Sequence, residues 1–168
     1  PGMRITTGDR SFTANLTFAE PDRSGFQAAI EAARRADVVV IALGEEAFQT
    51  GEGRSQTDIG LRGLQLELLQ EVHAVNDNIV LVLMNGRPLE LTWPADHVPG
   101  ILETWHLGSM AGHAIAHVLF GDYNPSGKLP VSFPYTVGQE PLYYNHKNTG
   151  RPTGDGNSPF WSHYTDAP

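Results

Sequence analysis

Carboxylate side chains gather in one stretch of the sequence that no hydrophobic pattern explains. Residues 44–60, GEEAFQTGEGRSQTDIG, contain three glutamates, an aspartate and an arginine. A carboxylic acid can donate or accept a proton in catalysis once burial raises its pKa. Glu52 stands between Gly51 and Gly53, two residues with unusual backbone freedom. We therefore expect Glu52 to reach into a site as a general acid or base, and an acidic solvated loop is the competing interpretation.

The elements around this stretch must position it, and their patterns are of α/β type. Short, continuous, β-branched runs predict buried parallel strands at 37–43 and 78–84, and a third strand is predicted at 100–105. Amphipathic spacing predicts the intervening helices. The alternation favours a crossover unit of α/β type with a parallel sheet. The predicted helices begin at the cap residue Ser24, run from Leu61 to Val75, and cover 109–120, where Gly121 ends the last one.

Three segments of the chain differ in character. Residues 1–24 have no clear period and are expected to be an irregular part of the same domain, and residues 25–137 form the predicted α/β core. A short strand at the sheet edge is expected between Pro130 and Pro134. Residues 138–168 are rich in Gly, Pro, Asn and aromatic residues, which predicts an extended segment that wraps a surface.

The loops after the three predicted strands should meet at one edge of the sheet. Ligands of open parallel sheets bind at the carboxyl ends of the strands. The first loop is also far longer than the roughly 2 to 6 residues usual for such a connection, as functional loops often are. The polar residues that can project toward this edge are Glu45, Glu46, Glu52, Arg54, Asp58, Asn85, Arg87 and His106.

Composition excludes several classes of function. The net charge is −8 over 168 residues, with scattered Lys and Arg, so neither nucleic acid nor an anionic membrane is an expected partner. No apolar run approaches the roughly 20 residues of a membrane span. The glycines at 44, 51 and 53 do not have dinucleotide-binding spacing. There is no cysteine, and His113 and His117 lack a third ligand, so no metal and no cofactor are expected.

Several longer segments of the sequence resemble those of a known protein family. ADVVVIALGEE, NIVLVLMNGRPLEL, GILETWHLG, AIAHVLFGDYNPSGKLPVSFP and YYNHKNTGRP resemble the C-terminal α/β sandwich domain of glycoside hydrolase family 3, in its bacterial periplasmic β-glucosidase-like branch. The resemblance implies a three-layer α/β/α sandwich with a mostly parallel sheet, partly truncated. It also implies a retaining exo-glycosidase of β-linked glucosides or oligosaccharides, with Glu52 as the general acid/base. It also implies an aspartate nucleophile in a preceding (β/α)8-type domain. We expect substrate contacts from Arg54, Glu45, Asn85, Arg87 and His106.

The departures from the family pattern limit what this chain can do alone. No Ser-Asp-Trp nucleophile context occurs, Met110 replaces a usual glutamate, and Gln56 replaces an arginine before TDI. The closing PFGYGLSY segment is also missing, so the chain is expected to be an inactive fragment. A non-catalytic carbohydrate-binding or domain-docking module is the alternative. The resemblance favours a periplasmic or secreted protein, and a cytoplasmic one stays possible. The sugar specificity and the existence of a homo-oligomer are left open.

Overall fold

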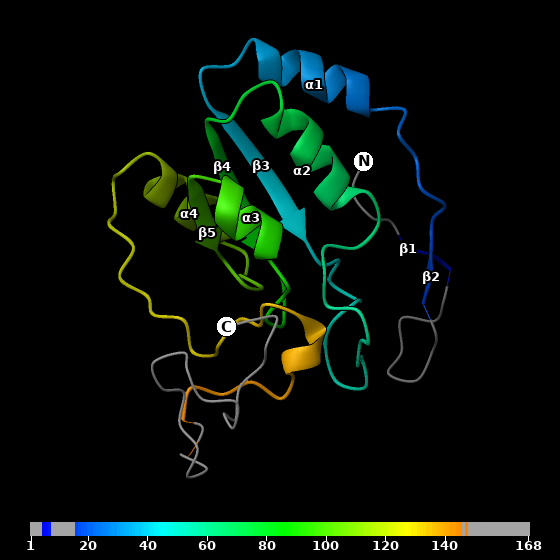
Figure 1. Ribbon diagram of the computed structural model, residues 1–168. Coiled ribbons are helices and arrows are strands. Elements are labelled where there is room, and N and C mark those ends of the chain that lie inside the picture. Colours follow the sequence, from blue (N-terminus) through cyan, green and yellow to red (C-terminus); the bar gives the residue numbers. More distant parts are fainter. Residues whose placement is uncertain (1–4, 8–15, 146, 148–168) are drawn as a thin grey trace, which may run out of the picture.

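A three-stranded parallel sheet forms the centre of the computed structural model, which describes residues 5–7, 16–145 and 147 (Figure 1). The strands are β3 (Val39–Gly44), β4 (Ile79–Met84) and β5 (Gly100–Glu103), and β4 lies between the other two. Leu81 and Leu83 of β4 are fully buried, as the continuous apolar run predicts. Gly44 pairs with Met84 and Leu83 with Glu103, so the three carboxyl ends share one edge.

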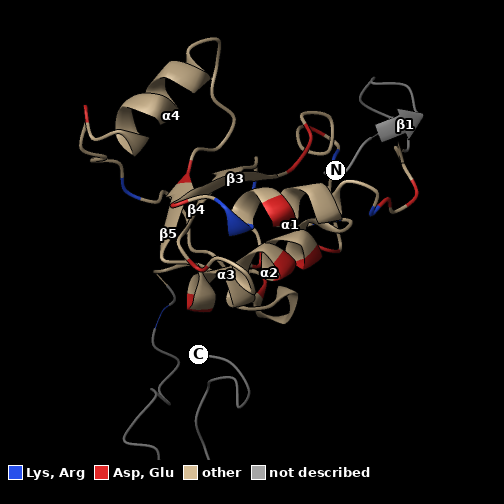
Figure 2. Cartoon of the chain, turned by 90° about the horizontal axis from the view of Figure 1, so that it is seen from above, with Lys and Arg blue, Asp and Glu red and all other residues tan. Residues whose placement is uncertain are grey.

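Helices cover both faces of the sheet, which confirms the predicted α/β sandwich with a parallel sheet. Figure 2 shows α1, α2 and α3 on one side of the strands and α4 on the other. The α4 side is the thinner layer, because α4 buries none of its residues and Val40 of β3 is 55% exposed. The helices are α1 (Phe26–Arg34), α2 (Gln65–His73), α3 (Thr92–His97) and α4 (Ala111–Leu119).

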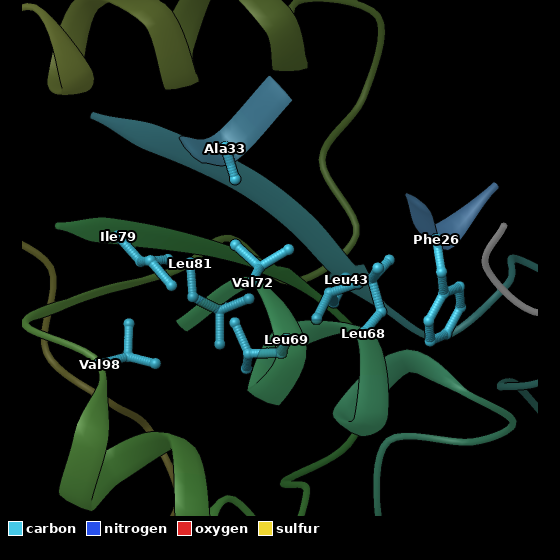
Figure 3. Close-up of a cluster of buried hydrophobic side chains, with 9 residues drawn as sticks. All are labelled: Phe26, Ala33, Leu43, Leu68, Leu69, Val72, Ile79, Leu81 and Val98. Atoms are coloured by element: carbon cyan, nitrogen blue, oxygen red, sulfur yellow. The ribbon is translucent and has the colours of Figure 1, made fainter. Parts of the chain in front are cut away.

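The hydrophobic core lies between the sheet and the helices α1 and α2. Leu69 and Leu81 are completely buried there, and Phe26 of α1 closes one end of the cluster (Figure 3). Burying such a side chain stabilises the fold by about 1.5–3 kcal/mol relative to leaving it exposed. Packing therefore holds β3 and β4 firmly against α2, and the loop between β3 and α2 departs from a rigid base.

Two elements differ from the sequence prediction near proline residues. The short helix α3 was not expected, because Pro94 lies inside it, yet a proline in the first turn removes no helical hydrogen bond. The predicted strand between Pro130 and Pro134 is wrong, since residues 131–133 form no strand. Prolines on both sides lack the N–H groups that pairing with a sheet would use.

The helix ends and the chain ends also show differences. Helix α1 begins after Gly25 rather than at Ser24. The main-chain N–H and hydroxyl of Ser24 donate instead to Asp22, and these bonds hold the pKa of Asp22 below its usual value. Gly121 ends α4 with a φ of 80°, as expected. The N-terminal segment contains an antiparallel pair, β1 (Ile5–Thr7) with β2 (Thr17–Phe18), and a 3-10 helix, η1 (Val137–Gln139), begins the C-terminal segment, of which 148–168 lie outside the described residues.

Candidate functional site

The long connection between β3 and α2, residues 45–64, lies against the loop that follows β4. The N–H of Glu45 donates to the carbonyl of Met84 at 2.8 Å, and the N–H of Gly86 donates to Glu45 Oε2 at 3.0 Å. Gly86 leaves room for Thr50, because a Cβ there would lie 2.3 Å from the Thr50 hydroxyl and would force that side chain to shift. These two hydrogen bonds therefore place the start of the acidic loop at the carboxyl edge of the sheet.

Glu52 is exposed at the tip of a turn inside this loop. The flanking residues Gly51 and Gly53 have φ angles of 129° and 72°, which side-chain-bearing residues rarely adopt. The N–H of Arg54 closes the turn by donating to the carbonyl of Gly51 at 3.1 Å. The backbone thus lifts the Glu52 carboxyl away from the core, and a partner surface would have to desolvate it.

A buried ion pair lies behind the turn. Arg87 Nε donates to Glu45 Oε1 at 2.8 Å, and the two side chains are 19% and 2% exposed. Arg87 Nη2 also donates to the carbonyl of Gln49 at 3.0 Å and to that of Arg54 at 2.9 Å. Glu45 and Arg87 were both predicted to contact substrate, and the structure brings them together with the ends of the Glu52 turn.

Asn85 and Glu103 lie deeper, at the ends of β4 and β5. Asn85 is fully buried and its Nδ2 donates to the carbonyl of Arg87 at 2.7 Å. Burial raises the pKa of Glu103, and hydrogen bonds from Trp105, Asn85 and Thr104 oppose the rise more weakly. Asn85 Oδ1 and Glu103 Oε2 have no hydrogen-bond partner among the described residues, which agrees with burial as the larger effect.

Glu103 should make the stability of the fold depend on pH. Because its folded-state pKa exceeds the ordinary 4.5, the folded chain holds the proton more tightly than the unfolded chain. The free energy of unfolding should therefore fall as the pH rises from the ordinary pKa through the raised pKa of the folded state. The side chain of Glu103→Gln is neutral at both pH 4 and pH 7. The melting temperature of this variant minus that of wild type should therefore be larger at pH 7 than at pH 4. Equal differences at the two pH values, measured by circular dichroism, would contradict this.

The remaining predicted contacts lie further apart. Arg54 is half-buried and joins the ion pair through its carbonyl group. His106 is exposed on the loop after β5, and no hydrogen bond in the described part of the chain links it to the Glu52 loop. It follows Trp105, whose φ of 53° is left-handed, a conformation of the kind that often occurs at functional sites.

Two buried glutamines support the site and were not predicted from the sequence. Gln65 is 3% exposed and forms two hydrogen bonds with the main chain of Gly44, from N–H to Oε1 at 2.8 Å and from Nε2 to the carbonyl at 2.9 Å. Gln49, whose carbonyl Arg87 binds, is 2% exposed. A signal for Gln65 existed, since it occupies the buried stripe of α2 with Leu68, Leu69 and Val72.

Metal ligands do not gather in the part of the chain that the structure describes. No group of three or more His, Cys, Asp or Glu side chains is close enough there to hold an ion. His113 and His117 are exposed on α4, and His117 Nδ1 lies 3.0 Å from Asp122 Oδ2. Across those same ranges, each helix is too short or too polar to cross a bilayer.

Comparison with known proteins gives one consistent result. The family model described as glycosyl hydrolase family 3 C-terminal domain matches residues 4–165. A periplasmic β-glucosidase of Salmonella typhimurium is 53% identical over 74% of this chain, and a β-xylosidase of Formosa agariphila is 46% identical over 73%. A β-glucosidase structure from Listeria innocua, in complex with gluconolactone, superposes with a TM-score of 0.84 at 41% identity over 89% of this chain. The chain spans only 16%, 17% and 21% of these three proteins.

Proposed function

Because the chain belongs to glycosyl hydrolase family 3, as its C-terminal domain, we propose that it supplies Glu52 as the general acid/base of a retaining β-glucosidase-like enzyme. One observation carries the proposal: Glu52 is the loop carboxylate that is exposed and accepts no hydrogen bond within the described residues. Glu45 is locked in an ion pair, Glu46 accepts from the N–H of Phe48, and Asp58 accepts from the N–H of Gly60. Glu52 is therefore available to a substrate.

The chemistry needs a second carboxylate that another domain would bring. In a retaining mechanism the two carboxyl groups lie about 5–5.5 Å apart, and an ionised one attacks the anomeric carbon. Glu52, as the acid, would protonate the departing glycosidic oxygen and then, as a base, take a proton from the water that releases the sugar. We propose an aspartate of a (β/α)8-type domain as the nucleophile. Contact with that domain would also shield Glu52 from solvent.

The proposed substrates are β-linked glucosides or oligosaccharides. The relatives named β-glucosidase and β-xylosidase support a β-linked sugar without separating glucose from xylose. We propose Arg54 and His106 as contacts to this substrate, since both lie toward the sheet edge from which Glu52 projects. Direct contacts from Glu45, Asn85 and Arg87 stay predictions, because their observed partners are the loops and one another.

The 168-residue chain alone should hydrolyse no 4-nitrophenyl β-glucopyranoside, because the proposed nucleophile belongs to another domain. Release of 4-nitrophenol would be followed with the chain alone and with the enzyme that contains both domains. We expect turnover from the second sample only. Turnover by the chain alone that disappears in Glu52→Gln would contradict the proposed division of the catalytic pair between two domains.

The alternative, a module that binds sugar or docks another domain without chemistry, predicts a different result. If it were correct, Glu52→Gln would leave the turnover of the two-domain enzyme unchanged. Titration of the chain with glucose or cellobiose, followed by NMR, would then show whether a sugar site exists without the second domain.

A further inference from the structure

One guanidinium group reaches three parts of the acidic loop. Arg87 Nε donates to the side chain of Glu45, and Arg87 Nη2 donates to the carbonyls of Gln49 and Arg54. Those two carbonyls stand on either side of residues 50–53, the turn that carries Glu52. A single nitrogen atom therefore joins the two ends of the turn.

The arginine is itself fixed to the sheet. Its neighbour Gly86 donates to Glu45 Oε2, its own carbonyl accepts from the buried Asn85, and Asn85 directly follows β4. Glu45 directly follows β3 and donates its N–H to the carbonyl of Met84. A continuous series of hydrogen bonds thus runs from the ends of two core strands to both ends of the turn.

We propose that Arg87 is a positioning residue, whose guanidinium group holds the Glu52 turn at the place where proton transfer requires it. The inference rests on the acid/base role proposed for Glu52. Arginine suits the task because its rigid, planar group donates in several fixed directions, whereas lysine offers one flexible point charge. Small displacements matter, since a shift of about 1 Å in a catalytic group can lower the rate about 100-fold.

The pairing with Glu45 serves the same purpose. An unpaired buried guanidinium would be costly and would favour the ionised form of any carboxylate near it. Glu45 neutralises that charge, so Arg87 can brace the turn without opposing the protonation of Glu52. The pair is nearly buried, which keeps water away from the hydrogen bonds to the turn.

Hydrogen–deuterium exchange of the full two-domain enzyme tests the proposal directly. In Arg87→Met, which keeps the chain length but removes every donor, we expect the amides of residues 46–56 to exchange about tenfold faster or more. Arg87→Lys should fall between Met and wild type. Arg35→Met is the matched control, because Arg35 is exposed and precedes β3 at the opposite edge of the sheet. Unchanged exchange in residues 46–56 of Arg87→Met would overturn the proposal.

Kinetics supply a second readout that simple loss of stability would not produce. Arg87→Met should lower kcat about 100-fold for cellobiose, whose leaving group needs a proton, and lower it much less for 2,4-dinitrophenyl glucoside. KM should change little. A large rise in KM with unchanged kcat would instead assign Arg87 to direct sugar binding and overturn the positioning role.

The two proposals fail in different ways, so the experiments separate them. If Glu52→Gln shows no dependence on the leaving group, the acid/base role of Glu52 is wrong. Faster exchange in Arg87→Met would still support the hold of Arg87 on the turn in that case. Should Arg87→Met fail to fold, which its melting curve would reveal, Arg87→Lys carries both measurements with smaller expected changes.

Discussion

If Glu52 is the acid/base of the proposed two-domain enzyme, Glu52→Gln there should lower the turnover of cellobiose by about 10²- to 10⁴-fold, the usual contribution of a positioned general acid. Glutamine keeps the size of the side chain and its place on the turn, but it has no acidic proton for the departing oxygen. A dinitrophenolate leaves without protonation, so the first chemical step on 2,4-dinitrophenyl glucoside should be almost unaffected. Comparing kcat/KM for these two substrates measures the effect.

Azide should rescue the same variant. Once the sugar is bound to the nucleophile, water needs a base to attack it, whereas the azide anion does not. Adding azide should therefore raise the turnover of the dinitrophenyl substrate and produce a β-glucosyl azide, detectable by NMR. Glu46→Gln is the matched control, since Glu46 lies in the same loop and is half-buried against the N–H of Phe48. Equal losses on both substrates without azide rescue would point to another residue.

Gly44→Ala, at the carboxyl end of β3, should be strongly destabilising. Gly44 has a φ of 142°, and a Cβ there would lie 1.9 Å from the carbonyl oxygen of Met84 in the neighbouring strand. Both the clash and the backbone strain have to be relieved by moving β3 away from β4. We expect the free energy of unfolding to fall by roughly 3 kcal/mol or more.

Chemical denaturation of Gly44→Ala and a matched glycine variant would measure this loss. Gly112 lies inside α4, and a Cβ there would meet no atom within 4 Å. Gly112→Ala should therefore stabilise the chain by about 0.5–1 kcal/mol, because alanine is the better helix former. A Gly44→Ala variant within about 1 kcal/mol of wild type would show that the strand pair adjusts without cost.

The sequence was sufficient for the sheet, because hydrophobic burial leaves a direct pattern in it. The apolar runs that became β3 and β4 are nearly continuous, as is typical of strands in a parallel sheet. The burial expected for both faces is found in β4 but not in β3, where Val40 is 55% exposed because the α4 layer does not cover it. Helix α3 has only six residues and contains Pro94, so no period was long enough to reveal it. The strand expected between Pro130 and Pro134 was predicted from the flanking turn and proline residues. In the structure this segment does not pair with the sheet.

The sequence predicted which loops meet at the carboxyl edge of the sheet, but it did not predict the contacts between them. Parallel topology brings the residues that follow β3 and β4 to one edge, so Glu45 and Arg87 were expected to lie near each other. Their mutual partners were not predictable, because the contact joins residues 42 positions apart and depends on the path of a long loop. Gln65 occupies a core position of α2 as a polar residue, and only the structure shows that its amide completes the hydrogen bonding of Gly44.

The tie between the carbonyls of Gln49 and Arg54 has a consequence for protein engineering. Arg87 Nη2 holds both ends of residues 50–53, so this four-residue segment can be replaced while the surrounding fold is kept. A shorter or longer insert between the same two carbonyls would move the acidic group by whole residues while the sheet keeps its register. Libraries of variants confined to these four positions would thus change how far the carboxyl group extends from the sheet. The residues outside the segment, on which folding of the domain depends, would stay the same.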